Sequence, residues 1–226
     1  MPVYLLSDEI IFPPVNHAER GGLLAVGGDL SPERLVAAYR KGIFPWYSEG
    51  EPILWWSPDP RMVLFPDEMH VSKSLKKVIR KGTFRISFDE DFGAVIRSCS
   101  ELVRRDQLGT WIVPEMIEAY EKLHAAGVAH SVEAWQGDTL VGGLYGLSIG
   151  RVFFGESMFS SVSEASKVAL ASLVNYLKLY GFRVIDCQQK TGLLRNFGAR
   201  EVHRDEFVDR IEEACEEAPD KMVWKS

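Results

Sequence analysis

The chain has 226 residues, of which 46% are hydrophobic and 26% charged, the composition of a folded protein with one or two domains. Its formal net charge of -6 argues against a protein whose whole surface grips nucleic acid, although it leaves room for a local basic patch. Three widely spaced cysteines argue against a disulfide framework and a zinc knuckle.

The start of the chain has early acidic residues and no basic leader, and no later segment approaches the roughly 20 apolar residues that a membrane helix needs. The odd number of cysteines favours a reducing compartment. We therefore expect a soluble, cytoplasmic protein that makes no use of a membrane.

The first part of the chain predicts a small aromatic unit. Residues 22–30 predict a strand and a glycine turn, and Ser31 caps a following helix that ends near Gly42. The segment 43–60 interleaves four prolines with five aromatic side chains, which predicts an ordered loop without regular strands. A strand is expected at residues 62–65.

The rest of the chain alternates helices and strands. The predicted helices cover residues 72–81, 114–126, 164–180, 191–197 and 205–217. The predicted strands cover residues 84–88, 130–135, 139–147, 151–154 and 182–188, with a turn at 136–138. Asp89 is placed to cap a further helix after the first of these strands. This order predicts a mixed α/β (α+β) domain behind the small aromatic unit.

The end of the strand at 182–188 contains the first candidate site. Alternation places Asp186 and Gln188 on one face of the strand, and Ile185 and Cys187 on the other. A carboxylate beside an amide at the carboxyl end of a strand can orient and polarise a nucleophile. The alternative is a buried polar pair whose hydrogen-bonding groups are satisfied and which has no role in function. Because Cys187 faces away from Asp186, it is expected to pack in the core rather than act as a nucleophile.

Glu156 is the second candidate. It follows the apolar run 152–154 and shares a face with Phe154 and Met158. A carboxylate beside apolar surface is either paired or functional, and a cap near Ser160 is the alternative.

Two further features could bind nucleic acid. Lys73, Lys76, Lys77 and Arg80 share one face of a predicted helix and could follow phosphates, or could be a solvated face. Tryptophans at 46, 55, 56 and 111 could stack on a nucleobase or pack in the core.

Several common chemistries lack their motifs. The five histidines show no ligand spacing, so no metal site is expected. The sequence contains no Walker loop, and no Gly-x-Ser-x-Gly elbow precedes a helix. Nucleotide hydrolysis and common serine-hydrolase chemistry are therefore unsupported.

Six short segments, in order between residues 22 and 188, resemble the leucyl/phenylalanyl-tRNA-protein transferase family. Among them are Gly155-Glu156-Ser157-Met158-Phe159-Ser160 and Ile185-Asp186-Cys187-Gln188. The other four segments are residues 22–31, 40–46, 52–61 and 109–112. Each segment is weak alone, whereas six in the same order make coincidence improbable.

The resemblance implies a small N-terminal domain at 1–62 and a C-terminal domain at 63–226 with the acetyltransferase-like (GNAT) fold. It also implies a reaction. Leucine or phenylalanine, and methionine less well, passes from aminoacyl-tRNA to the amino group of a protein that begins with Arg or Lys. The product is marked for degradation by the N-degron route. We expect a monomer.

The resemblance also assigns roles to residues. Trp46 and Trp111 hold the terminal adenosine of the tRNA, Met158 and Ile185 contact the aminoacyl side chain, and the basic helix face contacts the acceptor stem. Because an aminoacyl ester is already activated, no ATP, metal or other cofactor is expected.

An ordinary Asp has a pKa about 4 units below that of an α-amine, so Asp186 is a poor base for an ammonium group. Instead, Asp186 is expected to fix Gln188, whose carbonyl oxygen accepts a hydrogen bond from the attacking amine. Asp186 or Glu156 also attracts the cationic acceptor.

The chain departs from the family pattern at Leu193, where a histidine is usual, and at 196–199, where a Ser-Leu-Gly-Ala run is usual. Phe197 is larger than the leucine that is usual at this position and could reshape the pocket.

Two rival functions remain. An acyl-CoA-dependent N-acetyltransferase needs a small residue where the loop 195–200 ends in Arg. A non-catalytic tRNA- or peptide-binding module would not depend on Asp186 and Gln188.

Overall fold

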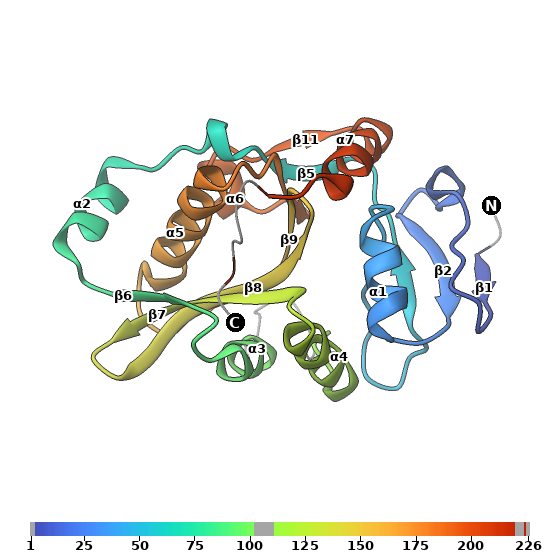
Figure 1. Ribbon diagram of the computed structural model, residues 1–226, viewed down its shortest axis with the longest axis horizontal. Helices are drawn as coiled ribbons and strands as arrows, with labels where there is room; N and C mark the ends of the chain where they lie inside the picture. The colour runs from blue at the N-terminus through green and yellow to red at the C-terminus, as the bar shows by residue number, and fades with distance from the viewer. Residues whose placement is uncertain (1–2, 102–110, 220–223, 225–226) are drawn as a thin grey trace.

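The computed structural model describes residues 3–101, 111–219 and 224, and shows a mixed α/β protein built on two sheets (Figure 1). The smaller sheet has the strand order β1-β2-β4-β3 and the larger has the order β11-β5-β10-β9-β8-β7-β6. Both sheets mix parallel and antiparallel neighbours. Among the described residues, no helix combines the length and apolar character needed to cross a membrane.

The smaller sheet belongs to the N-terminal part of the chain. Its strands are β1 (Tyr4–Leu6), β2 (Leu23–Gly27), β3 (Phe44–Pro45) and β4 (Leu54–Trp56), and helix α1 (Pro32–Tyr39) joins β2 to β3. The prediction that 43–60 lacks strands was wrong, because β3 and β4 lie within it. Since β3 is an edge strand, the missing N–H of Pro45 removes no bond from the interior of the sheet.

The larger sheet lies at the centre of the molecule. Its strands are β5 (Arg61–Leu64), β6 (Arg85–Phe88), β7 (Ala129–Gln136), β8 (Thr139–Ile149), β9 (Val152–Ser160), β10 (Val184–Gln188) and β11 (Arg200–Val202). The predicted hairpin is confirmed as β7 and β8. Strand β9 pairs antiparallel with β8 and parallel with β10. It extends to Ser160, well past the predicted end at 154, so Glu156 lies inside a strand.

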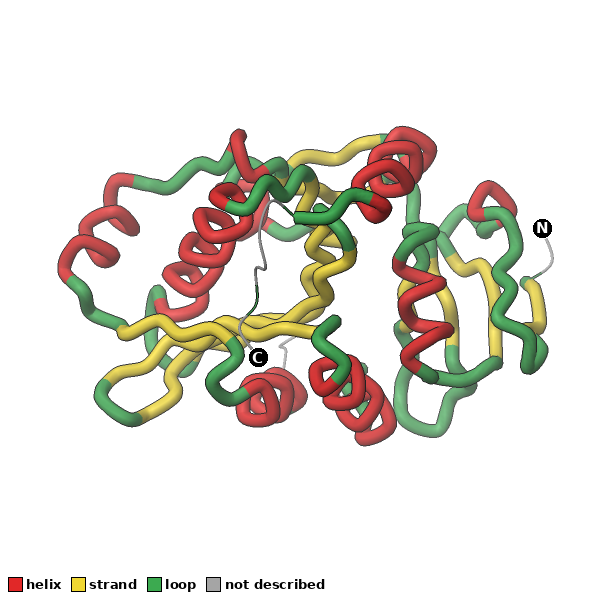
Figure 2. The backbone as a smooth tube through the Cα atoms, viewed as in Figure 1, coloured by secondary structure: helices red, strands yellow, loops and turns green. Residues whose placement is uncertain are grey.

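Helices cover both faces of this sheet. They are α2 (Lys73–Lys81), α3 (Phe92–Ser100), α4 (Pro114–Ala125), α5 (Ala165–Leu179), α6 (Gly192–Asn196) and α7 (Arg204–Glu216). Figure 2 shows α5 on one side of the strands, and α3 and α4 on the other. Alternation in β9 divides the core accordingly: Phe153 packs with α5, whereas Phe154 packs with α3 and α4.

Helix ends carry recognisable caps, and the cap predicted at Ser31 is confirmed. The side chain of Ser31 accepts a hydrogen bond from the N–H of Arg34, and Ser72 does the same for Leu75. Gly82 ends α2 in the left-handed conformation, with φ of 64°. The prediction for Asp89 was wrong. Asp91 caps α3, while Asp89 turns back to accept hydrogen bonds from the backbone N–H of Ser131 and from His130.

Candidate active site

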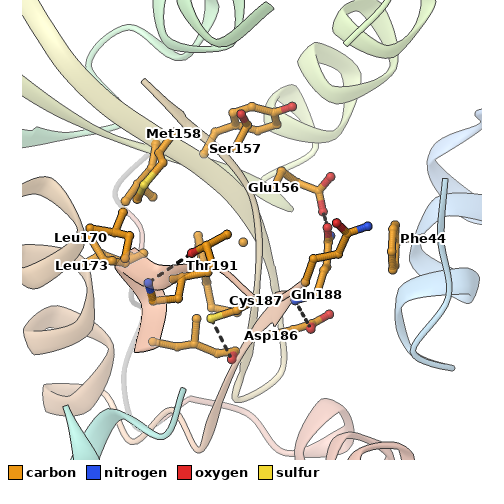
Figure 3. Close-up of a pocket in the computed structure, with 18 of the residues that line it drawn as sticks. Phe44, Glu156, Ser157, Met158, Leu170, Leu173, Asp186, Cys187, Gln188 and Thr191 are labelled. Atoms are coloured by element: carbon orange, nitrogen blue, oxygen red, sulfur yellow. Dashed lines mark hydrogen bonds between the residues drawn. The ribbon is translucent and has the colours of Figure 1, made fainter. Parts of the chain in front are cut away.

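A pocket of about 390 Å³ lies where β9 and β10 meet β3, α5 and α6 (Figure 3). Much of its wall is apolar, and this part includes Met158, Leu170, Leu173 and Ile185. The polar groups Glu156 and Gln188 stand on the side nearest Phe44. A largely apolar cavity with a few convergent polar groups is the usual form of a small-molecule or acyl-group site.

Two β-bulges aim the polar groups at each other. In the β8–β9 pairing, Gly146 lies opposite Gly155 and Tyr145 lies opposite Ser157, so Glu156 is the extra residue. A Cβ on Gly146 would come within 2.2 Å of the carbonyl oxygen of Phe154, so only glycine fits there. Bulges of this kind turn a side chain away from the regular pleat beside active sites.

The second bulge lies in β10 and falls on Cys187, because Asp186 pairs with Val63 and Gln188 with Met62. Gln188 adopts a positive φ of 57°, a strained conformation for a residue with a side chain. Its amide Nε2 donates a hydrogen bond to Glu156 Oε1 over 2.8 Å. The side chains of Glu156 and Gln188 are therefore joined directly.

Glu156 is also held by two tyrosines that the sequence did not indicate. Tyr39 of α1 donates to Oε1 over 2.7 Å, and Tyr120 of α4 lies 3.0 Å from Oε2. Burial raises the pKa of the Glu156 carboxyl to about 7; the two tyrosines and Gln188 oppose this shift, and nearby Asp186 adds to it. Burial, followed by the nearby Glu156 charge, also raises the pKa of both tyrosines well above its usual value.

Asp186 is fully buried in an ion pair with Arg61 of β5. Arg61 donates from Nε to Oδ1 over 2.8 Å and from Nη2 to Oδ2 over 2.7 Å. The guanidinium lies between the rings of Phe44 and Phe207, at 4.7 and 4.8 Å from their centroids. This pair therefore connects the large sheet to β3 of the smaller sheet.

Asp186 reaches Gln188 through the main chain. Its Oδ1 accepts a hydrogen bond from the backbone N–H of Gln188 over 2.9 Å, which supports the strained backbone there. The Gln188 side chain itself is oriented by Glu156. Cys187 is partly buried and also lines the pocket, so it is not enclosed in the core as expected. In Figure 3 its side chain points away from those of Asp186 and Gln188. Burial raises the pKa of its thiol far above the usual value, which disfavours a thiolate nucleophile.

The structure brings seven of the candidate residues to one pocket. Its lining includes Trp46, Trp111, Glu156, Met158, Ile185, Asp186 and Gln188. Residues 109 and 110 of one motif lie outside the described residues. The basic candidates Lys73, Lys76, Lys77 and Arg80 do not line the pocket. They lie exposed on α2, and none forms an ion pair with an acid in the part of the chain that the structure describes.

The two residues that depart from the family pattern, Leu193 and Phe197, lie in different parts of the structure. Leu193 lines the pocket, whereas Phe197 ends α6 and is buried in the core beneath it. Leu193 is thus the residue that can alter what the pocket accepts.

One cluster was not indicated by sequence spacing. Asp89, His124 and His130 each place one potential ligand atom within 4.8 Å of the others. However, His130 Nδ1 is 2.8 Å from Asp89, its Nε2 is 3.2 Å from the carbonyl oxygen of Gly127, and His124 Nδ1 is 2.8 Å from that of Ala129. Hydrogen bonds and ring stacking on Trp224 and Phe92 account for these side chains.

Comparison with known proteins decides the family. The family model described as "Leucyl/phenylalanyl-tRNA protein transferase" matches residues 63–212, and its N-terminal-domain model matches residues 28–59. The chain belongs to this family. The transferase of Solidesulfovibrio magneticus is 59% identical over 100% of this chain and 90% of its own length. That of Syntrophobacter fumaroxidans is 56% identical over 100% and 96%.

Among solved structures, L-PGS from Bacillus licheniformis aligns with a TM-score of 0.41 at 11% identity. The alignment covers 73% of this chain and 52% of that chain.

Proposed function

We propose that this member of the family is an aminoacyltransferase that moves leucine or phenylalanine, and methionine less well, from aminoacyl-tRNA to a protein beginning with Arg or Lys. The observation that carries the proposal is a pocket that joins an apolar wall to the Glu156–Gln188 pair and to two tryptophans. The apolar wall suits the side chain of leucine or phenylalanine.

The attack on the ester is assigned to the polar side of the pocket. Because Glu156 accepts a hydrogen bond from Gln188 Nε2, the amide oxygen of Gln188 is left to accept one from the incoming amine. Asp186 holds the backbone of Gln188 and, paired with Arg61, does not act as a base. The carboxyl of Glu156 faces the cationic acceptor. The aminoacyl ester is the activated donor, so the reaction needs no further cofactor.

Trp46 and Trp111 are assigned to the terminal adenosine of the tRNA. Both are half-buried and line the pocket, so each can offer part of a ring face to a base. The exposed basic face of α2 is assigned to the acceptor stem. We further propose a cytoplasmic monomer whose products enter the N-degron route.

The domain division remains a proposal: residues 1–62 form a small domain, and residues 63–226 form a catalytic domain with the GNAT fold. The change from one sheet to the other between β4 and β5 supports the boundary. The family resemblance supports the fold of the second part.

The function is tested by transfer of labelled phenylalanine from charged tRNA to a peptide that begins with Arg. A peptide beginning with Ala and an acetyl-CoA reaction serve as controls. We expect transfer to the Arg peptide alone. Acetylation without transfer from tRNA would contradict the proposal and identify an acyl-CoA-dependent enzyme, and binding of tRNA without either reaction would identify a non-catalytic module.

Replacing Trp46 or Trp111 by Ala is expected to weaken tRNA binding by about 1 to 3 kcal/mol, because one base loses its stacking partner. Turnover at saturating tRNA should change less. Affinity is measured by titration of charged tRNA with each variant. Trp135→Ala is the matched control, since Trp135 lies on β7 and is not among the residues that line the pocket. Equal losses in all three variants would contradict the stacking role.

Replacing Lys76 by Gln is expected to lower the salt dependence of tRNA binding. Each lost phosphate contact reduces the slope of log affinity against log salt by about 1. Lys122→Gln is the control, because it removes the same charge from an exposed position on α4. A slope that falls equally in both variants would show a general charge effect and no contact at α2.

A further inference from the structure

The carboxyl of Glu156 and the hydroxyls of Tyr39 and Tyr120 form a closed set of contacts behind the pocket. Tyr39 Oη is 2.7 Å from Glu156 Oε1, Tyr120 Oη is 3.0 Å from Oε2, and the two hydroxyl oxygens are 2.5 Å apart. Each contact lies within hydrogen-bond distance and therefore requires one proton. The two tyrosines supply only two.

The third proton must come from Glu156. With the carboxyl protonated, Oε2–H donates to Tyr120, Tyr120 donates to Tyr39, and Tyr39 donates to Oε1. Oε1 still accepts the hydrogen bond from Gln188 Nε2. With the carboxyl ionised, both tyrosines donate to it and no proton remains between their oxygens. The ring thus has two states that differ by one proton.

The ring lies where such a proton could be exchanged with a substrate. Tyr39 and Tyr120 are completely buried and are not among the pocket-lining residues, whereas Glu156 is half-buried and lines the pocket. The tyrosines come from α1 and α4, so packing of the N-terminal part against the large sheet assembles the ring. Only its carboxyl can meet a bound amine.

We propose that the Glu156 carboxyl and the hydroxyls of Tyr39 and Tyr120 form a ring of three hydrogen bonds, and that this ring takes one proton from the ammonium group of the acceptor before the amine attacks. The proposal rests on the proposed function. Glu156 is the group that meets the amine, and the tyrosines are positioning residues. The Asp186 carboxylate is engaged in its ion pair with Arg61, and Gln188 is an amide, so Glu156 is the carboxyl that is left to meet the amine.

One turnover removes two protons from the acceptor nitrogen. The acceptor ammonium gives one proton to the Glu156 carboxylate, and its nitrogen lone pair then forms the C–N bond to the ester carbon. The C–O bond to the ribose breaks, and its electron pair leaves with the oxygen. The nitrogen loses a second proton and the ribose oxygen gains one. Glu156 then releases the stored proton to solvent, so one proton is released overall.

The pKa of Glu156 agrees with this role. At about 7, it is only about one unit below that of an α-amine, compared with about four for an ordinary Asp. Among the described residues, the groups that face Glu156 are Tyr39 of α1, Tyr120 of α4, and Asp186 and Gln188 of β10. Asp186 is in turn paired with Arg61 of β5. Tyr145 of β8 packs edge-on against Tyr120. Cys187 lies between Asp186 and Gln188 on β10 and also lines the pocket, and its side chain points away from Glu156.

The test is a carbon-13 NMR pH titration of the glutamate carboxyl groups, with the Glu156 signal assigned by its loss in Glu156→Gln. We expect a midpoint near pH 7 in the unmodified protein. The double variant Tyr39→Phe/Tyr120→Phe should raise it by about one pH unit, because the carboxylate loses two charge-assisted donors. Tyr47→Phe, a buried tyrosine outside the ring, should leave it unchanged.

A glutamate midpoint below pH 5.5 for the assigned signal, or one unmoved by the double variant, would overturn the ring. The pH dependence of single-turnover transfer is measured beside the titration. We expect the rate to rise through the same midpoint and to follow it in the double variant. A normal titration in a protein without tRNA-dependent transfer would instead overturn the proposed function, so the two failures are distinguishable. If Glu156→Gln does not fold, Glu156→Asp assigns the signal instead, because it also removes this carboxyl from the glutamate signals.

Discussion

Replacing Gln188 by Ala is expected to lower turnover by about 100-fold or more, with little change in tRNA affinity. The substitution removes the amide oxygen that accepts a hydrogen bond from the attacking amine, a contact that matters in the transition state. It also removes the donor that Glu156 Oε1 receives from Gln188 Nε2. Single-turnover transfer at saturating charged tRNA measures the rate, and titration measures the affinity.

Gln136→Ala is the matched control, because Gln136 has the same side chain, is exposed at the end of β7, and is not among the residues that line the pocket. It should retain nearly full turnover. A normal rate in Gln188→Ala would remove Gln188 from the mechanism. A loss confined to tRNA affinity would assign it to donor binding instead.

Replacing Arg61 by Met is expected to destabilise the protein by about 3 to 5 kcal/mol, because it leaves the Asp186 carboxylate buried without its partner. In a chain of this length, that loss corresponds to a fall in Tm of roughly 10 °C. Unfolding in guanidinium chloride and a thermal scan measure the two quantities.

The double variant Arg61→Met/Asp186→Leu separates stability from function. Replacing both charges by apolar side chains should recover most of the lost stability, since neither charge is then left unpaired. Turnover should stay low, because the acceptor for the backbone N–H of Gln188 is gone. A single Arg61 variant as stable as the original protein would contradict the buried ion pair, and a fully active double variant would contradict the support of Gln188.

The corrections to the sequence predictions share a cause. Asp89 and Asp91 are both chemically fit to cap α3, and the difference is that β7 brings His130 and Ser131 to Asp89. In the same way, the prolines of 43–60 argue against strands, whereas β4 pairs along one edge with β2 from an earlier part of the chain and along the other with β3. In each case a partner that is distant in sequence decides between two locally acceptable outcomes.

The sequence by itself determined the features that depend on neighbouring residues. Capping by Ser31 and the hairpin of β7 and β8 follow from local backbone chemistry, and the structure has them where they were predicted. The helix expected at 72–81 is also present, as α2. The motifs also contained part of the pocket lining, including Glu156 and Gln188, whereas Leu170, Leu173 and Leu193 lie outside them.

Only the tertiary structure decided how those residues work. Tyr39 and Tyr120 are 81 residues apart, and Arg61 is 125 residues from Asp186, so no local pattern relates them. The two bulges change the direction of Glu156 and Gln188 by inserting a residue into the pairing, which period-two alternation does not include. The charges and protons of the site are set by burial and by contacts between distant segments, and these exist only once both sheets have packed together.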